Sequence, residues 1–260
     1  MEKGYCVFCH QEAMLSGEHI FSDWMNRVLG YRKYNITKTD SLHGDFKPWA
    51  AKSLNLKAKV VCEDCNSGWM SELENNLALP VLGSMLNKAY PFCLMPSGTA
   101  ALSCFAFKGA VVCDHLEIGR RKPFYSPSAR NRFKLSLDIP PGIQIWLSTL
   151  NTRVLRVLWR TDYYEPPPGP MRGLEIYVLT YIVGYVVIQV SSVRAVNRVK
   201  HKRMGRLIQD PAMKDICYQI WPSLGTVINW PTPGHLRDDM IEEFCGRWKS
   251  LTVYGKPHSR

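Results

Sequence analysis

Two kinds of hydrophobic pattern divide the chain into expected helices and strands. Residues 99–117 combine apolar and small residues over a length that strands rarely reach, which predicts a mostly buried helix. Residues 143–150, 153–160 and 174–190 are rich in branched and aromatic residues and predict strands. We expect the last stretch to form two buried strands that meet near Gly184. The later part of the chain should therefore combine helix with antiparallel sheet.

The stretch 174–190 also needs a test as a membrane span. It is 17 residues long and contains Glu175, whereas a spanning helix needs roughly 20 apolar residues. Its Val, Ile and Tyr content favours strands. No membrane association is expected.

Shorter patterns predict the elements of the first part. Ser22 or Asp23 can cap the start of a short helix, and Gly30 can end it. Residues 31–55 are polar and rich in turn-forming residues, which predicts an exposed loop. Residues 56–61 alternate in hydrophobicity and predict a strand.

Two further segments have the spacing of amphipathic helices. One should begin at Ser67 and be kinked or ended at Pro80. Its expected apolar face consists of Trp69, Leu73 and Leu77. The other is residues 236–248, near the end of the chain.

Charge is distributed unevenly about a proposed domain boundary in residues 91–98, which contain two prolines and a glycine. Residues 1–90 carry ten Lys or Arg against ten Asp or Glu, whereas residues 91–260 carry 23 against 12, so the net charge of +11 belongs to the second part. We therefore expect an α+β protein with domains at residues 1–95 and 96–260. An electrostatic attraction for nucleic acid must come mostly from the second domain.

Clusters of basic residues in that second domain are the candidate nucleic-acid contacts. They are Arg120, Arg121, Lys122, Arg198, Lys200, Lys202 and Arg203. The alternative interpretation is that these residues form solvated surfaces without a binding role. The same domain could also dock a protein partner or a second copy of the chain.

The nine cysteines predict a zinc site rather than disulfide bonds. Four of them form two C-x-x-C pairs, Cys6 with Cys9 and Cys62 with Cys65, and the other five lie among apolar neighbours. Four thiolates are a complete ligand set for a tetrahedral structural zinc ion. Unpaired cysteines are typical of a reducing compartment, and the first residues contain no apolar run, so a cytoplasmic protein without a secretory signal is expected.

Between the cysteine pairs lies the dipeptide Glu18-His19, and Asn66 directly follows the last cysteine. With these residues in this order, the chain resembles the zinc-ribbon form of the HNH endonuclease family, in particular a sub-group met in phages and bacteria. The continuation from Gly68 to Glu74 also fits that sub-group. The specific resemblance covers roughly residues 6–74.

The resemblance implies a ββα-metal site in the N-terminal domain. His19 matches the general base, Glu18 the acidic ligand of a catalytic Mg²⁺ or Mn²⁺ ion, and Asn66 the last ligand. Asn55 is the candidate for the residue that orients the catalytic imidazole, although it lies seven residues before Cys62, farther than is usual in the family. The expected substrate is DNA, with RNA as an alternative. A zinc-containing DNA-binding or scaffold protein with a degenerate, non-catalytic site also remains open.

Overall fold

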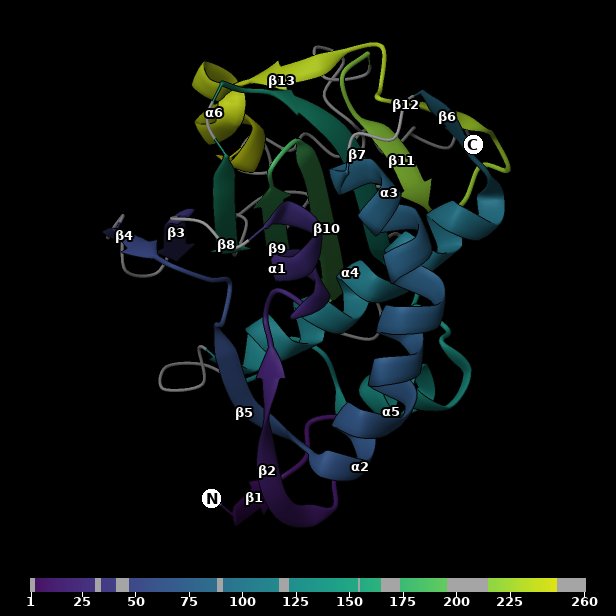
Figure 1. Cartoon of the computed structure of the whole chain (residues 1–260). Coiled ribbons are helices and arrows are strands. Elements are labelled where there is room, and N and C mark those ends of the chain that lie inside the picture. The colour runs from purple at the N-terminus through teal and green to yellow at the C-terminus, as the bar shows by residue number, and fades with distance from the viewer. Residues whose placement is uncertain are drawn as a thin grey trace, which may run out of the picture.

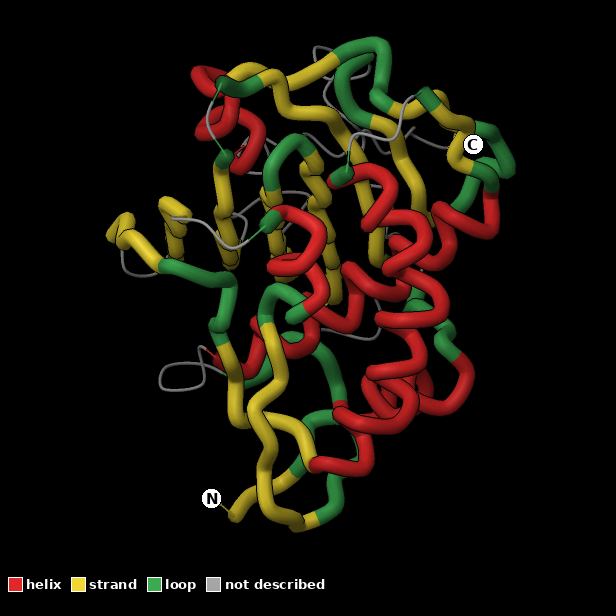
Figure 2. Tube along the Cα trace, in the orientation of Figure 1, coloured by secondary structure: helices red, strands yellow, loops and turns green. Residues whose placement is uncertain are grey.

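A computed structural model describes residues 3–30, 34–40, 47–87, 91–116, 122–153, 155–164, 174–195 and 215–246 (Figure 1). These residues form a mixed α+β structure in which helices pack against a large, mostly antiparallel sheet. Figure 2 shows the strands and helices along the same trace.

The first half of the described chain contains the small sheet, two strands of the large sheet and several helices. In order, these elements are β1 (Lys3–Tyr5), β2 (Glu12–His19), α1 (Trp24–Leu29), β3 (Tyr34–Asp40), β4 (Lys47–Ala51), β5 (Lys57–Cys62), α2 (Glu63–Cys65), η1 (Asn66–Met70), η2 (Leu73–Gly83), α3 (Ser84–Leu86), β6 (Phe92–Leu94) and α4 (Pro96–Leu116).

The second half contains most of the large sheet. Its elements are α5 (Pro127–Ser136), β7 (Ile143–Asn151), β8 (Arg156–Tyr164), β9 (Leu174–Val183), β10 (Val186–Ala195), β11 (Tyr218–Trp221), β12 (Ile228–Trp230), β13 (His235–Arg237), η5 (Asp238–Met240) and α6 (Ile241–Gly246).

Among the described residues, eight strands form the large sheet in the order β11-β7-β10-β9-β8-β3-β4, with β13 also paired to β7. The prediction of two buried strands meeting near Gly184 is confirmed: β9 and β10 pair antiparallel and are joined there. Gly184 has a φ angle of 60°, a left-handed conformation that glycine adopts easily in a tight turn. The strands predicted within 143–150 and 153–160 are confirmed as β7 and β8.

Helix α4 confirms the buried helix predicted over residues 99–117. It packs against η2, β5, β10 and β11. Its small residues permit close contact with the sheet: a Cβ at Gly109 would lie 2.6 Å from the hydroxyl oxygen of Tyr181 in β9. This long helix lies between the cysteine-containing N-terminal part and the sheet (Figure 1).

The exposed loop predicted over residues 31–55 is wrong, because this segment supplies β3 and β4 to the large sheet. Strand β3 pairs in parallel with β8 and antiparallel with β4. Tyr34 and Ile36 are fully buried. The polar composition did not reveal these strands, because only alternate residues of β3 are known to be buried and its parallel partner β8 lies far along the sequence.

Two helix predictions also need correction. The helix expected from Ser67 already begins at Glu63, and its helical turns continue past Pro80 through η2 into α3. Wider, π-type turns accommodate the proline, which has no N–H to donate. Leu77 is 42% exposed, whereas Trp69 packs edge-on against Phe8 with ring centroids 5.0 Å apart.

The predicted amphipathic helix over 236–248 is shorter than expected. The segment begins as β13, which pairs in parallel with β7, and becomes helical only in η5 and α6. The expected helix at Asp23 to Gly30 is confirmed as α1, with Gly30 at its C-terminus at a φ angle of 74°.

The N-terminal part contains a small sheet in the order β1-β2-β5. Strands β2 and β5 are antiparallel, and α2 follows β5 without a break. One hydrophobic core includes buried residues from Cys6 through Trp230 and so continues across residue 95. The domain division at 95/96 stays a prediction. In the part of the chain that is described, every helix is too short or too polar to cross a membrane.

Candidate metal centre and adjoining polar site

The four cysteines predicted as zinc ligands come together at the end of the small sheet. Their sulfur atoms all lie within 4.8 Å of one another, and the Cys9 and Cys62 sulfurs are 3.7 Å apart. A tetrahedral zinc ion with Zn–S bonds of about 2.3 Å places its sulfur ligands about 3.8 Å apart. Cys6, Cys62 and Cys65 are buried, so the cluster faces inward. This donor set fits one structural zinc ion.

Backbone hydrogen bonds hold the turn that contains the first cysteine pair. The Cys6 N–H donates to Gln11 and the His10 N–H donates to the Cys6 carbonyl, each at 3.0 Å, so the chain turns tightly around Cys9. The Val7 N–H donates to the carbonyl of Val60 in β5 at 2.9 Å. The turn is therefore fixed to the strand that leads into the second pair.

The thiols of this cluster lie close enough for the charge of one to affect the ionisation of another. Burial raises the pKa of the Cys65 thiol, and the negative charge of Cys6 raises it further. Burial likewise raises the pKa of the Cys62 thiol. Four adjacent thiolates therefore need a bound cation, and a zinc ion would supply that charge.

A buried arginine supports the first cysteine pair from behind. Arg130 of α5 donates from Nη1 to the Val7 carbonyl at 2.6 Å and to Nε2 of His115 at 2.8 Å. The other ring nitrogen of His115, Nδ1, lies 2.9 Å from the Val111 carbonyl and donates to it. His115 is therefore neutral, and burial lowers its pKa, with the charge of Arg130 adding to the effect.

His19 and Glu18 end strand β2 and point to opposite sides of it. The Nε2 atom of His19 lies 3.3 Å from Oδ1 of Asn55. Because an amide oxygen can only accept, Nε2 is the donor in this contact, and in a neutral imidazole Nδ1 then has the lone pair. Asn55 reaches this position because β2 and β5 are antiparallel, with His19 opposite Lys57 and the Ile20 N–H bonded to the Leu56 carbonyl.

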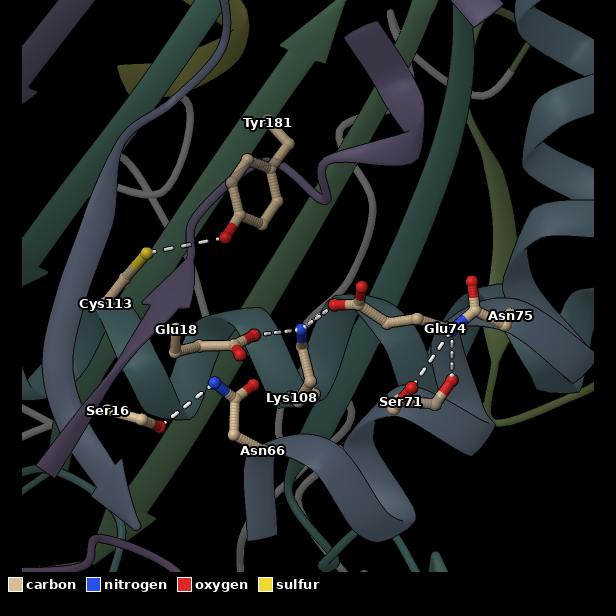
Figure 3. A network of polar contacts seen from close by, with 9 residues as sticks. All are labelled: Ser16, Glu18, Asn66, Ser71, Glu74, Asn75, Lys108, Cys113 and Tyr181. Carbon is tan, nitrogen blue, oxygen red and sulfur yellow. Dashed lines mark hydrogen bonds and ion pairs between the residues drawn. The ribbon is translucent and has the colours of Figure 1, made fainter. Parts of the chain in front are cut away.

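Glu18 is buried and forms an ion pair with Lys108 of α4. The Lys108 Nζ atom lies 2.5 Å from Oε1 of Glu18 and also contacts Oε1 of Glu74 in η2. Figure 3 shows the ammonium between the two carboxylates. Burial lowers the pKa of Lys108, but the two carboxylates together raise it by more, so the ammonium stays charged.

Asn66 projects from the start of η1 toward β2. Its Nδ2 atom donates to Oγ of Ser16 at 3.0 Å. In Figure 3 the amide of Asn66 and the carboxylate of Glu18 lie on the same side of the helix that carries Asn66. The hydrogen bond to Ser16 uses the amide nitrogen and leaves the amide oxygen available. A carboxylate and an amide oxygen suit a hard divalent ion such as Mg²⁺ or Mn²⁺.

One feature of the sequence distinguishes Lys108, which the predicted site residues do not include. It is the only Lys or Arg from residue 96 to residue 116, within a helix that is otherwise mostly apolar. A buried ammonium group needs a partner of opposite charge. Nothing in the local sequence shows that the partners are Glu18 and Glu74, which lie 90 and 34 residues earlier.

The predicted nucleic-acid contacts fall almost entirely outside the described residues. Lys122 is described and exposed. The others, which are not described, are Arg120, Arg121, Arg198, Lys200, Lys202 and Arg203. Their role stays a prediction.

Comparison of the chain with protein-family models, with curated proteins and with solved structures finds no match. The functional interpretation therefore depends on the residues and on the geometry described above.

Proposed function

We propose that the chain is a metal-dependent HNH endonuclease that hydrolyses DNA phosphodiester bonds and carries one structural zinc ion. The single observation that carries this proposal is the contact between His19 Nε2 and Asn55 Oδ1 at 3.3 Å. It joins the candidate base to the candidate orienting residue, although 36 residues separate them in the sequence.

The order of local elements also supports the proposal. Two antiparallel strands, β2 and β5, are followed directly by a helical segment. Glu18 and His19 end the first strand, and Asn66 follows the first helical turn. This order agrees with the ββα-metal arrangement that the resemblance implies.

In the proposed reaction, Asn55 holds the His19 ring so that Nδ1 can take a proton from the attacking water. An imidazole is suited to this exchange near neutral pH. Glu18 and Asn66 would hold Mg²⁺ or Mn²⁺ through oxygen atoms. The ion, when bound, would stabilise negative charge on the leaving 3′-oxygen.

The net charge supports a nucleic acid as the substrate class. The excess of Lys and Arg lies after residue 90, so phosphate would be attracted mainly by the second part of the chain. DNA is the proposed substrate, and a matched RNA is the comparison to make.

A non-catalytic zinc-containing DNA-binding or scaffold protein is the second candidate. The ion pair between Glu18 and Lys108 favours it, because this pair already gives the Glu18 carboxylate a cationic partner. Under this alternative, DNA binding would be insensitive to His19 and Glu18 but would be lost with Cys62.

A plasmid-nicking assay separates the two candidates. Purified zinc-loaded protein is incubated with supercoiled DNA and with Mg²⁺ or Mn²⁺, beside His19→Ala, Asn55→Ala and the control His235→Ala, which changes an exposed histidine of β13. We expect the wild type and the control to nick DNA, His19→Ala to lose the activity, and Asn55→Ala to be slower. Equal nicking by wild type and His19→Ala, or none by the wild type with any metal, would refute the catalytic proposal.

A further inference from the structure

Lys108 places a charged ammonium group inside the protein core. Its side chain is 3% exposed, and it lies in α4 beside the fully buried Phe107. Burial of an ammonium group without partners is strongly unfavourable. The cost is offset here by two carboxylates, Glu18 and Glu74, and by the Phe105 ring, whose centroid lies 5.4 Å from Nζ.

One carboxylate would be enough to neutralise Lys108, yet two contact it. The three charged groups come from three separate elements, β2, η2 and α4, and carry a net charge of −1 together. Glu74 is 15% exposed at its side chain, whereas Glu18 is almost completely buried. The cluster as a whole therefore keeps one formal negative charge, which a second cation bound at Glu18 would offset.

We infer that Lys108 is a positioning residue for the proposed divalent-metal site, and this inference rests on the proposed role of Glu18 as a metal ligand. The ammonium contacts Oε1 of Glu18 and leaves Oε2 as the ligand atom, on the side where Figure 3 shows the Asn66 amide. Glu74 holds the ammonium in place from the opposite side (Figure 3). Partners that hold a ligating carboxylate typically change metal affinity or activity by 10–100-fold when they are removed.

The proposed role of Lys108 connects helix α4 to the proposed divalent-metal site. Strand β2 and the helical turns around Asn66 supply the proposed ligands, and a side-chain contact from α4 reaches the Glu18 carboxylate. Lys108 makes this contact from a helix that packs on β5, η2 and the large sheet. The proposed metal site is therefore assembled partly by a residue beyond position 95.

Direct binding of Mn²⁺ tests this inference without relying on cleavage. Free Mn²⁺ is measured by electron paramagnetic resonance during titration of the zinc-loaded full chain, for wild type, Glu18→Gln, Lys108→Met and Glu74→Gln. Lys3→Met is the matched control, because it removes the lysine of an exposed Lys–Glu pair, Lys3 with Glu12. Zinc content and circular dichroism establish that each variant is folded.

We expect the wild type and Lys3→Met to bind Mn²⁺ equally and Glu18→Gln to lose this binding. Lys108→Met should raise the half-saturating Mn²⁺ concentration by roughly 10–100-fold. Glu74→Gln keeps an acceptor for the ammonium and should give a smaller but measurable increase. If Lys108→Met does not fold, Glu74→Gln decides, and unchanged binding in that variant would overturn the inference.

The remaining outcomes separate this inference from the proposed function. Unchanged Mn²⁺ binding in folded Lys108→Met would overturn the positioning role while a cleaving wild type would leave the nuclease proposal standing. Tighter binding in Lys108→Met would show that the ammonium competes with the cation, which also overturns positioning. Weaker binding in Lys108→Met with a wild type that binds Mn²⁺ but does not cut would support the inference and refute the nuclease. A wild type that does not bind Mn²⁺ would overturn both.

Discussion

The close contact between α4 and β9 predicts that Gly109→Ala destabilises the protein. A Cβ at this position would lie 2.6 Å from Oη of Tyr181, 2.9 Å from its Cε2 and 3.1 Å from its Cζ. The Tyr181 ring is buried, and its hydroxyl lies 3.4 Å from the Cys113 sulfur, so the ring has little room to move away. The new methyl group would therefore have to displace the helix or the ring.

Two opposing effects set the change in the free energy of unfolding that Gly109→Ala causes. Replacement of Gly by Ala in a helix interior is favourable by about 1 kcal/mol. Insertion of a methyl group into a packed core costs about 1–3 kcal/mol. Three Tyr181 atoms within 3.1 Å place this site in the upper part of that range, so we expect the free energy of unfolding to fall by about 1–2 kcal/mol.

Urea unfolding of the zinc-loaded protein, followed by tryptophan fluorescence, measures the change. Gly246→Ala in α6 is the control, because a Cβ there meets no described atom within 4 Å, and its effect should stay within about 0.5 kcal/mol. Tyr181→Phe should relieve part of the loss in a double variant, because it removes the nearest of the three atoms. A Gly109→Ala protein as stable as the wild type, or more stable, would refute this account of the helix–sheet contact.

Three further predictions concern the metal centre and its surroundings. Cys62→Ser should lose bound zinc, measured by metal analysis, and unfold at lower urea than the wild type, because a site with three thiolates holds zinc less well; retention of one zinc per chain would contradict the four-cysteine assignment. Arg130→Met should lower the free energy of unfolding by about 1.5–3 kcal/mol, because the buried Val7 carbonyl loses a charged donor. Arg132→Met, on the exposed side of the same helix, is the control and should have little effect. Equal effects of the two substitutions in urea unfolding would refute the structural role of Arg130. The pKa of His115 is lowered in the folded protein, so the unfolded chain binds more protons just below pH 6.5, and stability should fall as the pH drops from about 6.5 toward the folded-state pKa. His115→Gln should lose that part of the pH dependence, measured as the difference in urea stability between about pH 7.5 and pH 5.5. The same difference in the variant and the wild type would refute this role of His115.

Patterns that are local in the sequence predicted their elements well. The pair β9 and β10 followed from a branched apolar stretch interrupted by Gly184, and α4 followed from length and composition. Strands β3 and β4 were missed, because the strand that pairs with β3 begins at Arg156, more than a hundred residues later. Sequence spacing contains no information about such a partner.

The same distinction applies to the candidate site. The cysteine cluster could be predicted because each C-x-x-C pair is a local motif that already fits two positions of a tetrahedral ion. By spacing, Asn55 lies farther from Cys62 than the resemblance implies, and the antiparallel register of β2 and β5 is what brings it to His19. Lys108 could not be paired with Glu18 in advance, since only the packing of α4 brings the two together.

The parallel pairing of β3 with β8 has a consequence for the order of folding. Asn35 in β3 lies opposite Arg156 in β8, 121 residues later, whereas the cysteine pairs close a much shorter stretch of chain around β3. Contacts between distant residues form slowly, and synthesis delivers the N-terminal segment first. The cysteine cluster can therefore bind its ion on the ribosome before β8 has been synthesised and can pair with β3. Until β8 emerges, β3 lacks this partner, and its unpaired backbone groups are open to incorrect pairing with another chain.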